Sequence, residues 1–210
     1  MAAGSSEAPG GPATPAGYAA LEREAAIYPD ASRRVFRVLG DEDRALRALN
    51  GLVTADVLAR DGDEAIPTLI LTPKGKVLAD AVVVRAGNEL LLDVPAAAWD
   101  DLEAHFSRYL PPKFARLEPS ELRVVRIRGP LALERERTDL ELTRLDGPQY
   151  TAQEGSRWSA TRFRDGVATR PPEGYDLYLP PDAVLGLGLP EASDDAWEIF
   201  RVESGIPVYG

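Results

Sequence analysis

The stretch between residues 66 and 94 constrains the fold more than any other part of the sequence. Two runs rich in β-branched and other apolar residues, 66–71 and 77–85, flank the segment Thr-Pro-Lys-Gly-Lys at 72–76. Proline presets the φ angle of a turn and glycine accepts a positive φ, so the sequence predicts a β-hairpin here. A second turn at 86–88 leads into 90–94, which we expect to be a third strand.

Helical and extended patterns alternate on both sides of this region. We expect helices over 18–28, 41–50, 95–109 and 194–204, and further strands over 33–39, 113–117, 122–127, 140–145, 157–163 and 175–179. Because helices interleave with hairpins, the sheets should be mixed or mainly antiparallel, with helices packed against them. The sequence therefore predicts an α+β protein.

The same patterns suggest how the chain is divided. Residues 1–17 are mostly Ala, Gly, Pro, Ser and Thr and lack the apolar area that offsets the entropy of ordering, so we expect a disordered tail. A first α+β subdomain is predicted over 18–128. After Gly129 and Pro130 the patterns weaken, and we expect a second, smaller α+β subdomain over 129–210.

Composition disfavours several classes of function. The 210 residues include no cysteine and one histidine, so the chain can form no disulfide, thiolate metal site or two-histidine mechanism, and we expect no metal. A formal net charge of −10 argues against nucleic acid as a partner. No apolar run reaches the roughly 20 residues of a membrane helix. Residues 1–17 lack the features of a secretory signal, so we expect a cytoplasmic protein with no membrane partner.

One acidic side chain stands out within the predicted hairpin. Period-two alternation places Asp80 on the same strand face as Leu78, Val82 and Val84. A carboxylate on an apolar face needs a partner, because burying it unpaired costs several kcal/mol. Two kinds of partner fit the pattern: an arginine of the same chain in an internal salt bridge, or the paired N–H donors of a ligand, as a pterin or a guanidinium presents.

Two basic side chains lie on predicted helices. Arg201 falls in the last turn of the final helix, where it can interact with the helix dipole or pair with Glu198. His105 lies beside the apolar face of the helix 95–109 and has no nucleophilic or metal-binding companion, which favours a structural role. The residue pattern alone assigns neither to a site, and it assigns no catalytic residue.

Three segments share their order and spacing with one known family. They are Leu-Asn-Gly-Leu-Val-Thr-Ala-Asp-Val at 49–57, Leu-Thr-Pro-Lys-Gly-Lys-Val-Leu-Ala-Asp at 71–80 and Phe-Arg-Val-Glu-Ser-Gly-Ile-Pro-Val-Tyr-Gly at 200–210. Residues 91–95 and 174–180 add to the similarity. Over residues 18–210 the chain therefore resembles the folate-binding proteins of the YgfZ type, which are related to the T-protein (aminomethyltransferase) of the glycine cleavage system.

The resemblance implies a folate-binding domain like that of the aminomethyltransferases, with tetrahydrofolate as the ligand. By position in the matching segments, Asp80 would contact the pterin ring and Arg201 would lie at the folate site. For Asp80 this joins the argument from the strand pattern, because the 2-amino and N3–H groups of tetrahydrofolate are paired donors. We therefore rank the ligand-binding role of Asp80 above the internal salt bridge.

Departures from the family pattern separate its branches. Residues 170–173 stand where aminomethyltransferases carry a Thr-Gly-Glu block, and Ala79 precedes Asp80 where they usually carry a second acid. Both differences favour the YgfZ-like branch. The chain ends at Gly210, before that branch's cysteine-bearing Lys-Gly-Cys-Tyr-x-Gly-Gln-Glu motif and its barrel-like third domain. We therefore expect a chain truncated before the family's C-terminal part.

Three hypotheses about function follow from the resemblance. The first is a tetrahydrofolate-binding accessory protein of iron-sulfur cluster assembly or repair, with iron-sulfur assembly proteins as partners. The second is an aminomethyltransferase that transfers a one-carbon unit to tetrahydrofolate, and the third is a truncated family member without activity. We favour the accessory protein over the enzyme, and we expect weak folate binding, because one wall of the family's central channel would be absent.

Overall fold

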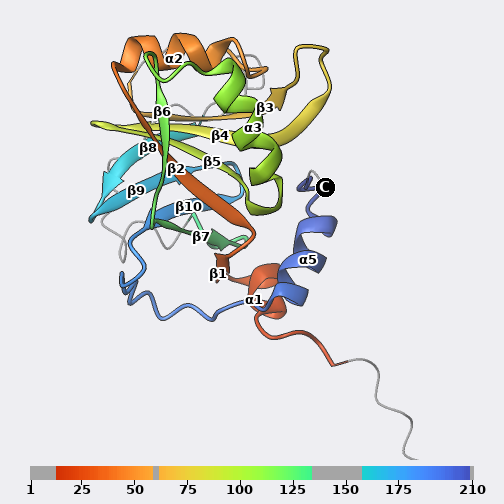
Figure 1. The fold of residues 1–210 in the computed structure, drawn as a ribbon. Helices are drawn as coiled ribbons and strands as arrows, with labels where there is room; N and C mark the ends of the chain where they lie inside the picture. The colour runs from red at the N-terminus through yellow and green to blue at the C-terminus, as the bar shows by residue number, and fades with distance from the viewer. Residues whose placement is uncertain (1–12, 59–61, 134–157, 209–210) are drawn as a thin grey trace, which may run out of the picture.

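A single curled sheet dominates the computed structural model, which describes residues 13–58, 62–133 and 158–208 (Figure 1). The sheet has ten strands in the order β1-β7-β10-β9-β8-β3-β4-β5-β2-β6, and neighbouring strands pair antiparallel. The strands are β1 (Ala26–Asp30), β2 (Arg33–Leu39), β3 (Glu64–Leu71), β4 (Val77–Ala86), β5 (Glu89–Pro95), β6 (Arg116–Pro119), β7 (Arg123–Arg128), β8 (Trp158–Phe163), β9 (Gly166–Arg170) and β10 (Gly174–Leu179). The helices are α1 (Tyr18–Arg23), α2 (Glu42–Asn50), the short 3-10 helix η1 (Ala96–Ala98), α3 (Trp99–Tyr109) and α5 (Asp194–Glu203).

The hairpins predicted between residues 66 and 94 are present. β3 pairs with β4 so that Leu69 lies opposite Asp80, and β4 pairs with β5 so that Val82 lies opposite Asp93. In the first turn the backbone N–H of Gly75 donates to the carbonyl oxygen of Thr72. The structure therefore combines helices with a mainly antiparallel sheet, as the sequence predicts.

One predicted helix is shorter than expected. α1 ends at Arg23, and β1 (Ala26–Asp30) takes the place of the last turns of the helix predicted over 18–28. Ala26, Tyr28 and Asp30 are buried along β1 in alternation with less buried residues, because this strand pairs with β7 along its whole length. Over so short a run the apolar residues fit both the helical period and the two-residue period of a strand, and the pairing with β7 decides between them.

Other elements differ from expectation in smaller ways. The strand predicted over 113–117 appears as β6 and begins at Arg116, because residues 111–114 form a turn in which Phe114 N–H donates to Pro111. β9 was not predicted, and it forms a hairpin with β8. The strand predicted over 140–145 lies outside the described residues. The helices predicted over 41–50 and 194–204 are α2 and α5, each with its expected start.

The curled sheet has an outer and an inner face. α2 and α3 cover the outer face of β2 to β5, where odd-numbered β4 residues such as Ala81 and Val83 join the largest core with Leu49 and Phe106 (Figure 1). The inner face brings together strands that are far apart in sheet order. There Val82 and Val84 of β4, Val35 of β2 and Leu91 of β5 belong to one apolar cluster with Val124 of β7 and Tyr178 of β10.

The sheet continues across residue 129, the predicted subdomain boundary. β7 precedes this residue and β10 follows it, yet the two strands pair directly. The division into 18–128 and 129–210 stays a prediction. Of the predicted tail, residues 1–12 lie outside the described ranges, whereas the carbonyl of Ala16 accepts a hydrogen bond from the N–H of Ser193 at 3.0 Å. Among the described helices none is long and apolar enough to cross a membrane.

The start of α1 packs tightly against the segment before α5, and alanine substitutions test this contact. Gly17 and Gly75 have similar φ angles, +80° and +77°, so alanine at either position carries a similar backbone strain of about 1–2 kcal/mol. A Cβ on Gly17 would also lie 2.5 Å from Cα of Ala192, whereas one on Gly75 meets nothing within 4 Å. Thermal denaturation should show a clearly larger fall in Tm for Gly17→Ala than for Gly75→Ala. Equal shifts would contradict the packing of Gly17 on Ala192.

Candidate functional site

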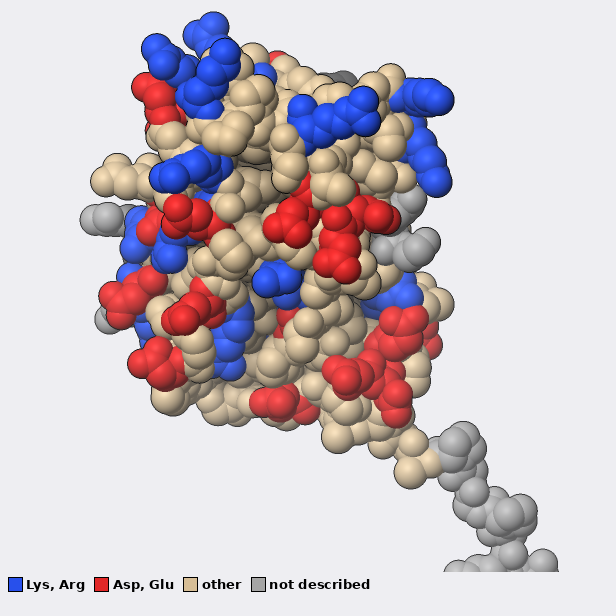
Figure 2. Space-filling view, viewed as in Figure 1, with Lys and Arg blue, Asp and Glu red and all other residues tan. Residues whose placement is uncertain are grey.

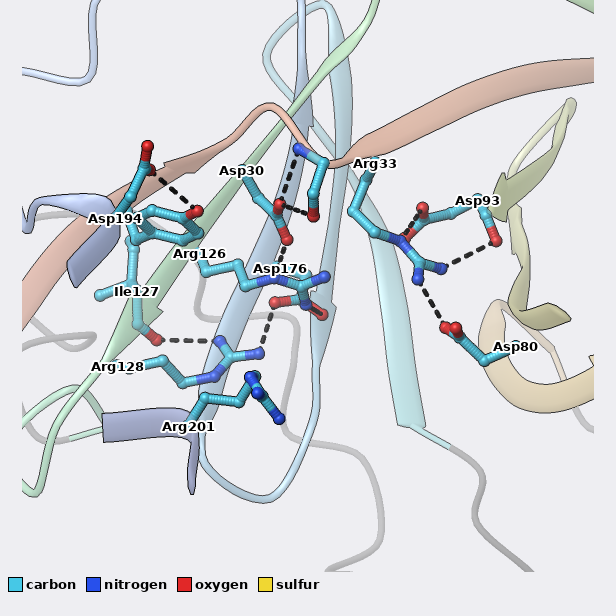
Figure 3. Close-up of polar contacts among 12 residues, drawn as sticks. Asp30, Arg33, Asp80, Asp93, Arg126, Ile127, Arg128, Asp176, Asp194 and Arg201 are labelled. Atoms are coloured by element: carbon cyan, nitrogen blue, oxygen red, sulfur yellow. Dashed lines mark hydrogen bonds and ion pairs between the residues drawn. The ribbon is translucent and has the colours of Figure 1, made fainter. Parts of the chain in front are cut away.

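Seven charged residues gather on the inner face of the sheet (Figure 3). Charged side chains on the surface are solvated and of mixed sign, with Lys and Arg toward the end that carries α2 and Asp and Glu toward α1 and α5 (Figure 2). Those of the inner face are mostly withdrawn from water, which requires each to be paired. We call this set the inner charge cluster: Asp30 on β1, Arg33 on β2, Asp80 on β4, Asp93 on β5, Arg126 and Arg128 on β7, and Asp176 on β10.

The alternation of side chains along each strand explains why the inner charge cluster lies on the inner face. Asp80 lies two residues before Val82 on β4, and Asp93 lies two residues after Leu91 on β5. Arg126 follows Val124 on β7 by the same interval. Since side chains two apart share a face of a strand, the apolar cluster of the inner face continues along each strand into the charged one.

Arg33 connects two acidic residues of neighbouring strands. Its Nε donates to Oδ1 of Asp93 at 2.8 Å, and its Nη2 donates to the backbone oxygen of Asp93 at 3.2 Å. Its Nη1 donates to Oδ2 of Asp80 at 2.5 Å. The arginine is almost fully buried, with 9% of its side chain exposed, so its position is fixed by these contacts.

Asp93 is held from two sides. Besides Arg33, the hydroxyl of Tyr178 on β10 donates to Oδ2 of Asp93 at 3.1 Å. Burial raises the pKa of Asp93, and Arg33 offsets this only in part. Burial and the nearby Asp93 charge also raise the pKa of Tyr178 well above its usual range, so the hydroxyl remains a donor. Through this contact the cluster links β5 to β10 across the inner face.

The other half of the cluster is a closed set of ion pairs. Arg126 donates to Asp30 at 2.6 Å and to Asp176 at 3.0 Å, and Arg128 donates to the second oxygen of Asp176 at 2.6 Å. Burial alone would raise the pKa of Asp176, but Arg126 and Arg128 together hold it below its usual range. The ring of Trp197 on α5 lies 5.8 Å from the guanidinium of Arg126. This half therefore joins β1, β7, β10 and α5.

Asp80 differs from the other acids of the cluster. A third of its side chain is exposed (33%), whereas Asp93 and Asp176 are each exposed by 1%. Its Oδ2 pairs with Arg33, while its Oδ1 is buried and accepts no hydrogen bond within the described part of the chain. The internal salt bridge that the sequence allowed is thus formed, and one carboxylate oxygen is left for another partner.

Among the described residues, the hydrogen bonds of Arg201 go to its own end of the chain. Its Nε donates to Glu198 at 2.9 Å, Nη2 also donates to Glu198, and Nη1 donates to the carbonyl of Ile206 at 2.8 Å. Among the described residues no hydrogen bond or ion pair joins Arg201 to Asp80 or to Arg33. The pairing with Glu198 confirms the interpretation from helical spacing, and a role for Arg201 at a folate site stays a prediction.

Of the inner charge cluster, sequence reasoning singled out Asp80 alone, and it also missed Tyr178. Asp93 carried the same signal as Asp80, an acid inside an apolar strand, but it was not singled out. Arg33 begins a strand, where a charged residue is ordinary, and Tyr178 reads as an amphipathic core residue. His105 is buried beside Tyr109, where burial lowers its pKa, in agreement with a structural role. Across the three described ranges no group of three His, Cys, Asp or Glu side chains is arranged to hold a metal ion.

The fold has a counterpart among solved structures. No protein-family model matches the sequence, and no curated protein matches it. The structure is similar to glycine cleavage system aminomethyltransferase T from Bartonella henselae, with a TM-score of 0.61 and 14% sequence identity. The match covers 89% of this chain and 48% of that one, so the chain spans about half the length of that protein. The likeness shows an aminomethyltransferase-like fold.

Removing the charge of Asp93 should cost much more stability than removing that of Asp80. Asp93→Asn leaves a buried Arg33 with one charged partner, and we expect a loss of roughly 3 kcal/mol, as for a broken buried ion pair. Asp80→Asn leaves Arg33 paired with Asp93 and changes a partly exposed group, so about 1 kcal/mol is expected. Urea denaturation of both variants measures the difference. An equal loss would identify Asp80 as a purely structural partner of Arg33.

Proposed function

We propose that this chain is a tetrahydrofolate-binding protein in which Asp80 receives the pterin ring. The state of Asp80 supports this most: Arg33 fixes one oxygen, and the other is buried without a hydrogen bond from the described residues. A carboxylate held in this way can accept the paired 2-amino and N3–H donors of a pterin. When bound, tetrahydrofolate would supply a carrier for one-carbon units, and the chain would hold and orient its ring.

The fit of Asp80 to such a ligand follows from the desolvation of Oδ1. A buried acceptor without a donor costs free energy, and a ligand that supplies the donor recovers it. A third of the Asp80 side chain is exposed, whereas Asp93 and Asp176 are each exposed by 1%, so of these three acids Asp80 is the one that a ligand from solvent would meet. The aminomethyltransferase-like fold adds support at the level of the fold. Independently, the resemblance in residues 71–80 assigns the pterin contact to the same carboxylate.

We propose an accessory role in iron-sulfur cluster assembly or repair rather than aminomethyl transfer. The resemblance to the YgfZ branch supports this choice, since residues 170–173 stand where aminomethyltransferases carry a Thr-Gly-Glu block. Pro172 is exposed in the turn between β9 and β10, and a proline side chain offers no hydrogen-bond acceptor for a ligand. Aminomethyl transfer is the second candidate, because the similar solved structure is an aminomethyltransferase.

Calorimetric titration with tetrahydrofolate tests the binding site. We expect the parent to bind it and Asp80→Asn to weaken the affinity at least about tenfold, since an amide cannot accept two parallel N–H bonds. Asp101→Asn, which removes an exposed carboxylate on α3, should bind as the parent does. A parent without measurable binding would overturn the proposal. So would an Asp80→Asn variant that binds equally well.

Complementation in cells tests the physiological role. In a strain that lacks this protein, the activity of an iron-sulfur dehydratase should fall under oxidative stress, and the parent sequence should restore it. Asp80→Asn should fail to restore it, while Asp101→Asn should succeed. Loss of glycine-dependent one-carbon transfer without any loss of dehydratase activity would favour the aminomethyltransferase instead. A strain that loses neither activity would indicate a chain without either function.

A further inference from the structure

Arg33 has donor capacity that its internal contacts do not use. A guanidinium carries five N–H bonds, and three of those of Arg33 go to Oδ1 of Asp93, to the Asp93 backbone and to Oδ2 of Asp80. One hydrogen on Nη1 and one on Nη2 have no acceptor among the described residues. The side chain is nine-tenths buried, so these hydrogens are largely removed from water. An acceptor beside Asp80 would satisfy one of them.

Arg33 and Asp80 together present three adjacent polar atoms. Oδ1 and Oδ2 of Asp80 are acceptors on one carbon, and Nη1 of Arg33 is a donor 2.5 Å from Oδ2. Oδ2 can accept a second hydrogen bond besides that of Nη1, because a carboxylate oxygen has two lone pairs. A ligand that matches these three atoms carries, on consecutive positions of one edge, a donor for Oδ1, a donor for Oδ2 and an acceptor for Nη1. The spacing within the set is comparable to that between neighbouring groups along the edge of a heterocycle.

We propose that Arg33 determines the specificity of the Asp80 site, and that the pair recognises the 2-amino-4-oxo edge of a fused pyrimidine ring. Where the ring is a pterin, this inference about Arg33 rests on the proposed function of tetrahydrofolate binding. The 2-amino and N3–H groups would donate to Asp80, and the 4-oxo oxygen would accept from Nη1 of Arg33. Guanine nucleosides present the same 2-amino-4-oxo edge. The experiment must therefore distinguish a pterin from a guanine as the ring that the pair recognises.

A 4-amino ring is the informative competitor. Replacing the 4-oxo group by an amino group turns the acceptor that faces Arg33 into a donor, and it removes the hydrogen from N3. The guanidinium would then face another donor, and Asp80 would lose one of its two hydrogen bonds. Sites built around buried polar groups reject analogues that leave those groups unpaired. The pair should therefore discriminate against the 4-amino ring.

Asp93 and Tyr178 act as positioning residues for this arrangement. Asp93 holds Nε and Nη2 of Arg33, and Tyr178 holds the far oxygen of Asp93. Only a guanidinium can contact Asp93 and Asp80 at once through separate nitrogens of one rigid plane. A lysine at this position keeps the charge but cannot hold both acids and also offer a donor at a fixed place.

The test compares two ligands that differ only at position 4. Folic acid and its 4-amino analogue aminopterin are titrated into the parent protein by calorimetry at pH 7, where both pteridine rings are uncharged, with guanosine as a third ligand. We expect folic acid to bind at least about tenfold more tightly than aminopterin. In Arg33→Lys this ratio should fall, because only the lost hydrogen bond to Asp80 still disfavours aminopterin, while folic acid still binds through Asp80. The ratio in the parent decides the proposal even if the variant fails to fold.

The possible outcomes separate this inference from the proposed function. Equal binding of folic acid and aminopterin by the parent would overturn the role of Arg33 and leave folate binding in place. Binding of guanosine without binding of either folate would support edge recognition and overturn the folate function. Binding of none of the three ligands would overturn the role of Arg33, and the separate titration with tetrahydrofolate would then decide the proposed function. A preference for folic acid that persists unchanged in Arg33→Lys would assign the discrimination to another residue.

Discussion

The ion pairs of Arg33 are the constraint on which the rest of the inner face depends. A buried guanidinium requires acidic partners, and Arg33 finds them on two other strands, β4 and β5. Asp93 in turn contacts Tyr178 on β10, so one cationic side chain fixes the distance between the two parts of the curled sheet. The most exposed acid of the inner charge cluster, Asp80, is therefore held by a largely buried arginine that two other strands share.

Local signals predicted the elements around this site well. Turn residues at 72–76 fixed the β3–β4 hairpin, and Asp41, whose side chain accepts from the N–H of Arg44, marked the start of α2. The alternation of β4 was sufficient to single out Asp80 as an acid in an apolar strand. What local pattern could not provide was the partner of Asp80, because Arg33 lies 47 positions earlier in the chain and is joined to it only by sheet order.

Partners distant in sequence also explain where the sequence-based predictions differ from the structure. The helix predicted over 18–28 overlaps the start of β1 because apolar residues recur there at helical spacing. Only the pairing with β7, about a hundred positions away in sequence, turns Ala26, Tyr28 and Asp30 inward. The sequence leaves ligand binding and an internal salt bridge as alternative roles for the Asp80 carboxylate. A carboxylate has two oxygens, however, and within the described residues only Oδ2 of Asp80 has a hydrogen-bond partner. The resemblance to folate-binding proteins pointed to Asp80 but carried no information about Arg33, Asp93 or Tyr178.

The length of chain between the members of the inner charge cluster bears on how the molecule folds. The hairpins of β3, β4 and β5 close over short loops, whereas Arg126 reaches Asp30 across 96 positions and Tyr178 reaches Asp93 across 85. Proteins dominated by contacts between such distant positions fold slowly, because the entropy of loop closure is lost before these contacts are gained. Until β1 and β10 dock on β7, the arginines and aspartates of the cluster remain hydrated. The buried ion pairs therefore depend on contacts of high sequence separation, and so do the surroundings of Asp80, whose partner Arg33 lies 47 positions away.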